Sequence, residues 1–259
     1  METTTRSLIT VFHRDGYCVV PDVINSEQVD RWRSALARHL AAQPPEPGRT
    51  GPYFLWPALT DHTDLRALYE ECGIGDAVRP FLRPDLALPD PEVAQLALTL
   101  PPHPRHPGAP HIDGLTPTED DGRPGTFTLL AGLMLTDQRQ QDRGNLWVWP
   151  GTHLSTAALL RHHGADALRD AAPYPPVDLP TPLQVTGAAG SLVLVHYLLA
   201  HNIGGHFGTA DDERRETVYF RLRADGHRER WRQAVTDPLL EFATPAPEPG
   251  PGLITGDGR

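Results

Sequence analysis

The apolar and polar positions follow two different rhythms along the chain. In the first third, apolar residues recur every three or four positions, which is the period of a helix with one buried face. This pattern predicts helices over residues 8–12, 26–40, 65–72 and 74–82. We expect Ser26 to be the N-cap of the second helix, a short strand over residues 17–20, and a Pro/Gly-rich loop over residues 43–57.

After Pro89 the apolar residues fall into short runs that turn residues separate, which is typical of strands. The runs predict strands over residues 93–100, 127–135, 146–149, 191–199 and 217–222, with one helix over residues 157–171. Helices followed by strands indicate a mainly β fold, a barrel or sandwich with flanking helices. We therefore expect a single domain over residues 1–242, in which helices of residues 1–88 pack on a β core of residues 89–224. Residues 243–259 are expected to form a disordered tail.

Composition narrows the possible functions. The formal net charge is −10, which disfavours a nucleic-acid partner, and no apolar run is long enough for a membrane span. All 23 basic residues are arginine, so phosphate-loop lysines, Schiff-base lysines and Ser–Lys nucleophiles are excluded. Two cysteines cannot form a disulfide framework, and the start of the chain lacks the pattern of a signal peptide. We expect a cytoplasmic protein.

The motif His-x-Asp occurs three times, at residues 13–15, 62–64 and 111–113. Alternate residues of a strand point to one side, so such a pair can bind one metal ion. The first motif ends a predicted helix, and the second precedes one, where Asp64 is expected to be the N-cap. The third follows a strand and a Pro-rich loop and is followed by Gly114, which favours a chain reversal at the rim of a site.

A second candidate segment is the buried strand that runs from residue 190 into His201. If this strand stays regular, His201 shares a face with Tyr197. His111, Asp113 and His201 then supply two imidazoles and one carboxylate, the facial triad typical of non-haem iron(II) oxygenases. An arginine on the next strand, Arg215, could bind a carboxylate of a co-substrate through two parallel hydrogen bonds.

Three segments in this order resemble the phytanoyl-CoA dioxygenase family: residues 12–21, the run Gly-Asn-Leu-Trp-Val-Trp-Pro-Gly-Thr-His of residues 144–153, and residues 190–201. The resemblance implies a double-stranded β-helix, a jelly-roll like that of cupins. It also implies Fe(II) as the metal, with 2-oxoglutarate and O2 as co-substrates.

The same resemblance implies roles for individual residues. His111 and Asp113 match the proximal metal ligands, and His201 matches the distal one. The family's co-substrate arginine has two candidates, Arg214 and Arg215, of which Arg215 fits better because an aliphatic residue stands three positions later. Gln95 and Thr99 resemble positions that contact the other end of 2-oxoglutarate in some members.

The function implied is oxidation of a small molecule, most often hydroxylation, with release of succinate and CO2. Bacterial secondary metabolism or amino-acid-related metabolism is the expected context. Two alternatives stay open: a catalytically silent jelly-roll that only binds a ligand, and a hydrolase or isomerase that uses another divalent metal. The family often has polar residues where this chain has Ile112, Ile203 and His206. The roles of His206 and Trp147, and the oligomeric state, are left open by the sequence.

Overall fold

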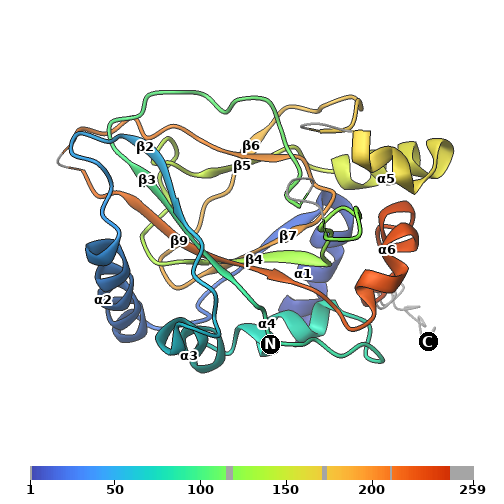
Figure 1. The fold of residues 1–259 in the computed structure, drawn as a ribbon, viewed down its shortest axis with the longest axis horizontal. Coiled ribbons are helices and arrows are strands. Elements are labelled where there is room, and N and C mark those ends of the chain that lie inside the picture. The colour runs from blue at the N-terminus through green and yellow to red at the C-terminus, as the bar shows by residue number, and fades with distance from the viewer. Residues whose placement is uncertain (1, 115–118, 171–173, 211, 246–259) are drawn as a thin grey trace, which may run out of the picture.

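The computed structural model describes residues 2–114, 119–170, 174–210 and 212–245, and these form two facing sheets with helices outside them (Figure 1). The larger sheet is antiparallel, with the strand order β1-β7-β4-β9-β3-β2. Its strands are β1 (Tyr17–Val20), β2 (Gly51–Leu55), β3 (Ala94–Leu100), β4 (Leu129–Met134), β7 (Leu192–His196) and β9 (Arg215–Leu222). The smaller sheet has the order β6-β5-β8 and consists of β5 (Leu146–Val148), β6 (Leu183–Gln184) and β8 (His201–Ile203).

The helices form two groups around the sheets. One group lies on the outer face of the larger sheet and consists of α1 (Glu2–Asp15), α2 (Ser26–Ala42), α3 (Thr63–Glu71), α4 (Ile74–Val78) and the 3-10 turn η1 (Arg79–Phe81) (Figure 1). The other group consists of α5 (Thr152–His163), the 3-10 turn η2 (Ala165–Asp170) and α6 (His227–Thr236). Within the described residues, no helix combines the length and the apolar content that crossing a bilayer requires.

The alternation of side chains across the larger sheet creates two separate cores. Even-numbered residues of β9, such as Val218 and Phe220, pack against the outer helices. Odd-numbered residues, such as Tyr219, pack instead into the space between the two sheets. The same parity holds in β3, where Leu96 belongs to the outer core and Ala97 to the inner one. The odd-numbered side chains of both strands therefore point to the inner face. They include the candidate site residues Gln95, Thr99 and Arg215.

The jelly-roll with flanking helices is confirmed, and several local predictions need correction. The predicted loop over residues 43–57 contains β2, which is an edge strand. Pro52 is tolerated there because alternate residues of an edge strand direct the N–H position away from the sheet. The N-cap of α2 is Asn25, which forms a capping box with Gln28, and not Ser26. The N-cap of α3 is His62, so Asp64 lies in the first turn of that helix.

The predicted strand over residues 191–199 is also too long. It ends at His196, whose ring nitrogen Nδ1 accepts a hydrogen bond from the Leu198 N–H at 3.0 Å and thereby forms a turn. His201 belongs to β8 of the other sheet. A continuous apolar run hides such a turn because every residue in it is buried. The helix predicted over residues 157–171 begins earlier, at Thr152, and α6 was not predicted at all.

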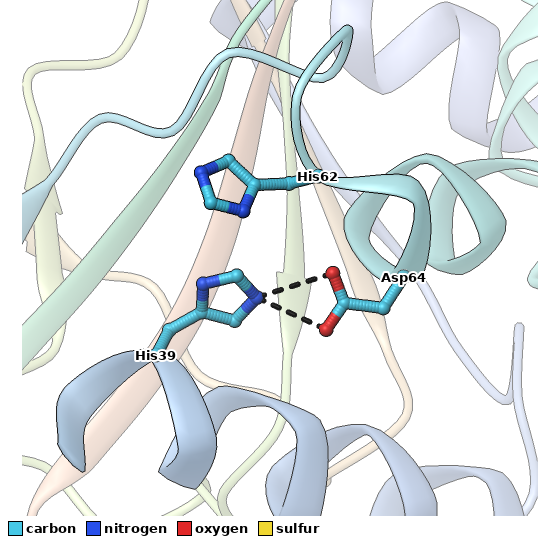
Figure 2. A group of neighbouring side chains, drawn as sticks. All are labelled: His39, His62 and Asp64. Atoms are coloured by element: carbon cyan, nitrogen blue, oxygen red, sulfur yellow. Dashed lines mark hydrogen bonds and ion pairs between the residues drawn. The ribbon is translucent and has the colours of Figure 1, made fainter. Parts of the chain in front are cut away.

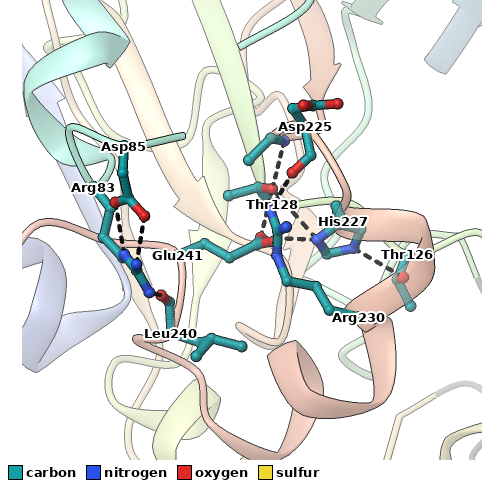
Figure 3. A network of polar contacts seen from close by, with 10 residues as sticks. Arg83, Asp85, Thr126, Thr128, Asp225, His227, Arg230, Leu240 and Glu241 are labelled. Carbon is teal, nitrogen blue, oxygen red and sulfur yellow. Dashed lines mark hydrogen bonds and ion pairs between the residues drawn. The ribbon is translucent and has the colours of Figure 1, made fainter. Parts of the chain in front are cut away.

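The C-terminal part of the described chain is tied to the sheet by a buried polar network (Figure 3). The Glu241 carboxylate is 3% exposed and accepts hydrogen bonds from Thr128 Oγ1 at 2.7 Å, His227 Nδ1 at 2.8 Å and Arg230 Nε at 2.7 Å. Burial alone would raise the pKa of Glu241, but its hydrogen bond and charge contact with His227 hold the pKa below its usual value. The network joins α6 to Thr128, the residue before β4. Residues 246–259 of the predicted tail lie outside the described residues.

We expect Glu241→Gln to lower the free energy of unfolding by about 3 kcal/mol, because the substitution leaves buried donors facing an amide in place of a carboxylate. Chemical denaturation followed by circular dichroism measures the change. Asp85→Asn is the matched control, since the Arg83–Asp85 ion pair lies at the surface nearby (Figure 3). Equal stability losses in the two variants would contradict a structural role for the buried network.

Candidate active site

Two histidines distant in sequence are held together by the backbone. The N–H of His111 donates to the carbonyl of His201 at 3.0 Å, and the N–H of His201 donates to the carbonyl of His111 at 3.3 Å. This antiparallel bridge places the two imidazole rings side by side, with their centroids 4.5 Å apart. The pairing is a direct consequence of β8, which begins at His201 and lies opposite the segment that carries His111.

The carboxylate of Asp113 completes the cluster. Its Oδ1 lies 3.7 Å from His111 Nε2 and 4.0 Å from His201 Nε2. Gly114 has a φ of +76°, and a Cβ at that position would meet the Gly125 carbonyl oxygen, so only glycine allows the reversal there. The structure thus brings together one donor atom from each of His111, Asp113 and His201, all within 4.8 Å of one another.

Hydrogen bonds and charges prepare these donors for a cation. His201 Nδ1 lies 3.0 Å from the Leu199 carbonyl, so the Nδ1–H donates there and Nε2 keeps its lone pair. Burial lowers the pKa of the His111 imidazole to about 4, which keeps that ring neutral. Burial opposes ionisation of Asp113, but the charges around it hold its pKa below the usual value. Two imidazoles and one carboxylate suit Fe(II).

Arg221 forms an ion pair with the second oxygen of the Asp113 carboxylate. Its Nη2 lies 3.3 Å from Asp113 Oδ2, which leaves Oδ1 directed at the two imidazoles. The guanidinium carbon is 4.9 Å from the centroid of the Trp56 ring and 5.6 Å from that of Phe127. Arg221 therefore orients the carboxylate and is itself held between aromatic rings.

Arg215 lies on the same inner face of β9 and is 2% exposed. Its Nε donates to Gln138 Oε1 at 3.0 Å, and its Nη2 donates to the Tyr219 hydroxyl at 2.5 Å. Its Nη1 has no hydrogen-bond partner among the described residues. Thr99 is the register partner of Arg215 on β3, is fully buried, and its hydroxyl also has no partner there.

Two buried polar groups without partners among the described residues, side by side on neighbouring strands, fit a bound anion. A guanidinium and a hydroxyl are suitable donors for the far carboxylate of 2-oxoglutarate. The residues present therefore fit the co-substrate as well as the metal. Arg214, the other candidate, has a side chain that is 40% exposed and pairs with Glu216 at 2.8 Å.

Gln95 lies four residues before Thr99 and is the register partner of Tyr219. It is half-buried and lines a cleft of about 740 Å³, together with Trp56, Tyr219 and Arg221. Trp56 is 49% exposed at this cleft. The cleft thus reaches the inner face of the sheet next to the arginine that holds Asp113, and its size suits a small molecule.

His206 and Trp147, whose roles the sequence left open, both pack within the fold. His206 is fully buried; its Nε2–H donates to the Glu213 carbonyl at 2.8 Å, and its Nδ1 accepts from the Gly208 N–H at 3.2 Å. It therefore shapes the loop before β9. Trp147 is half-buried and packs against Gly204, where a Cβ would meet its ring.

Gln138, Arg221 and the site role of Tyr219 are not predicted from the sequence. Tyr219 and Arg221 lie four and six residues after Arg215 on one strand. Strand alternation predicts the same face for Tyr219 and Arg215, and the same rule extends to Arg221. Gln138 follows β4 and reaches Arg215 only through the fold. Its position therefore had no local signal.

The chain matches the family described as Phytanoyl-CoA dioxygenase (PhyH) over residues 12–215. A comparison with curated protein sequences found no significant match. Solved structures are similar at low sequence identity. The non-heme alpha ketoglutarate dependent carbocyclase SnoK from nogalamycin biosynthesis has a TM-score of 0.60 at 20% identity, covering 86% of this chain and 89% of that one.

Two further structures are similar over most of their length. HygX from Streptomyces hygroscopicus, with nickel and 2-oxoglutarate bound, has a TM-score of 0.56 at 19% identity and covers 83% of this chain and 85% of that one. EctD from S. alaskensis has a TM-score of 0.57 at 18% identity, covering 84% and 76%. These likenesses confirm the fold. The family match and the three converging donors agree with the expected Fe(II) and 2-oxoglutarate. The chain belongs to the phytanoyl-CoA dioxygenase family.

Proposed function

We propose that this chain is an Fe(II)/2-oxoglutarate-dependent dioxygenase that hydroxylates a small molecule. His111, Asp113 and His201 bind the metal, and Arg215 with Thr99 binds the far carboxylate of the co-substrate. The observation that carries the proposal is the combination of three converging donors with the partnerless Nη1 of Arg215 on the inner face of one jelly-roll. A ligand-binding protein without catalysis has no need for both features together.

The protein's own groups bind and orient the reactants. Fe(II), when bound with 2-oxoglutarate and O2, supplies the oxidising chemistry and the release of succinate and CO2. His201 is held in the correct tautomer by the Leu199 carbonyl, and Arg221 orients the Asp113 carboxylate. Gln138 and Tyr219 fix the Arg215 guanidinium, so that little side-chain entropy is lost when an anion binds. Apolar side chains between the sheets exclude water from this space.

The substrate is proposed to be a polar small molecule of bacterial secondary or amino-acid-related metabolism. The cleft beside Gln95 offers both arginine and carboxylate side chains, among them Arg223, Arg228 and Glu92. Two of the similar structures support this class, since one comes from nogalamycin biosynthesis and another holds hygromycin B. The similar structures include a carbocyclase and an epimerase, so ring formation and epimerisation are the alternative outcomes of the same site.

The proposal is tested by supplying the purified chain with Fe(II), 2-oxoglutarate, O2 and a panel of candidate substrates. We expect succinate to form in proportion to the product, and replacement of Fe(II) by Zn(II) to stop both. Succinate is quantified by chromatography, and the product by mass spectrometry. Normal binding of Fe(II) and 2-oxoglutarate without any succinate would favour the silent binding protein. A product formed with Zn(II) and without 2-oxoglutarate would favour the hydrolase or isomerase.

A further inference from the structure

A second group of metal-binding side chains lies outside the proposed active site, between α2 and α3 (Figure 2). His39 comes from the last turn of α2, and His62 and Asp64 come from the start of α3. One donor atom from each lies within 4.8 Å of the others, and all three residues are half-buried. The His-x-Asp motif of residues 62–64 is predicted from the sequence to cap a helix, because no local pattern shows that α2 adds a third donor.

The distances within this group suit a bound cation. His39 Nε2 lies 3.2 Å from Asp64 Oδ1 and 3.1 Å from Oδ2. Two ligands of a tetrahedral zinc ion, at about 2.0–2.1 Å from the metal, are roughly 3.3 Å apart. The rings of His39 and His62 have centroids 4.9 Å apart at an angle of 70°. Figure 2 shows the His39 ring facing the Asp64 carboxylate and the His62 ring above the His39 ring. The His39 nitrogen and the Asp64 oxygens are therefore already near the spacing of two ligands that share one ion.

Other contacts of the group leave the donors available. Asp64 Oδ1 accepts a hydrogen bond from the Leu65 N–H at 3.0 Å, which orients the carboxylate as an outer partner of a metal ligand does. Arg38 Nη2 lies 3.7 Å from Asp64 Oδ2, but its side chain is 67% exposed and can move into solvent. Imidazole and carboxylate donors select zinc and similar transition ions over Mg²⁺ or Ca²⁺.

We propose that His39, His62 and Asp64 form a second metal site, which binds Zn²⁺ and joins the end of α2 to the start of α3. Solvent reaches the half-exposed group, so water supplies the remaining ligand. The site closes the segment of residues 40–61 into a loop, and such a constraint stabilises the folded chain. This segment contains β2 and Trp56, whose ring lies 4.9 Å from the guanidinium carbon of Arg221. The ion therefore restrains Trp56, which lines the cleft beside Gln95.

The test must separate this site from the proposed iron site, which also binds zinc. We would use the full chain with His111→Ala and His201→Ala together, and titrate it with Zn²⁺ alone by calorimetry and equilibrium dialysis with elemental analysis. We expect a single zinc ion per chain with micromolar affinity. Zinc at about a hundredfold excess over its Kd should raise the unfolding midpoint by about 5 °C. Adding His62→Ala should abolish both effects.

The controls address surface histidines and folding. His162→Ala, in the same double variant, removes half of an exposed histidine pair on α5 and should leave zinc binding unchanged. His62→Gln keeps a polar side chain and should lose zinc in the same way as His62→Ala while retaining the circular dichroism spectrum of the parent. Zinc binding that survives either His62 substitution, or that is absent from the double variant, would overturn the second site. Neither outcome depends on succinate formation, so the proposed function is tested separately.

Discussion

Replacing His111 with alanine is expected to reduce Fe(II)-dependent succinate formation at least about a thousandfold, because losing several kcal/mol of metal coordination corresponds to that factor. His111 offers its Nε2 to the same space as His201 and Asp113 Oδ1, so its removal leaves only two donors. The measurements are the initial rate of succinate formation and the iron content after dialysis. Both should fall together if His111 acts as a metal ligand.

The matched control is His106→Ala, five residues earlier in the same Pro-rich loop. His106 is exposed, and its ring centroid lies 5.8 Å from that of Phe207, so iron content and rate should stay near those of the parent chain. A His111→Ala variant with unchanged iron content would remove His111 from the metal site. A variant with normal iron content but no turnover would instead indicate a role in substrate binding or proton transfer.

The arrangement of the larger sheet follows from local patterns to a considerable degree. Strand alternation puts Gln95 and Thr99 on one face of β3, and Arg215 on one face of β9 with Tyr219. In the structure both faces belong to the inner side of the sheet, where Thr99 is the register partner of Arg215 and Gln95 that of Tyr219. Alternation works here because one face packs against helices and the other against the second sheet. A slip of one residue would bury the arginine against the helices.

The remaining parts of the site depend on contacts that no local pattern encodes. Tyr197 was expected to share a strand with His201, but the turn after His196 separates them into different elements. The turn is formed by the His196 side chain itself, which a hydrophobicity pattern cannot register. Gln138 reaches Arg215 across 77 positions of sequence, and His39 reaches Asp64 across 25. Such pairs are visible only once the sheets and helices have packed.

Replacing Arg215 with lysine is expected to raise the KM for 2-oxoglutarate about a hundredfold, since the loss of a charge-assisted hydrogen-bond pair costs roughly 1.5–3 kcal/mol. Lysine keeps the positive charge but lacks the planar fork, so it cannot contact Gln138, Tyr219 and a carboxylate at the same time. The measurement is the steady-state rate at varied 2-oxoglutarate and saturating Fe(II), with iron content as a check that the metal site is intact.

Arg214→Lys is the decisive comparison, because the two arginines are adjacent and only one faces the space between the sheets. Arg214 pairs with Glu216 and is 40% exposed, whereas Arg215 is 2% exposed with a free Nη1 among the described residues. Arg214→Lys should therefore leave the KM for 2-oxoglutarate nearly unchanged. The opposite ranking of the two variants would assign the co-substrate carboxylate to Arg214. In that case, the partnerless groups of Arg215 and Thr99 would have to bind the substrate, because two buried donors require an acceptor.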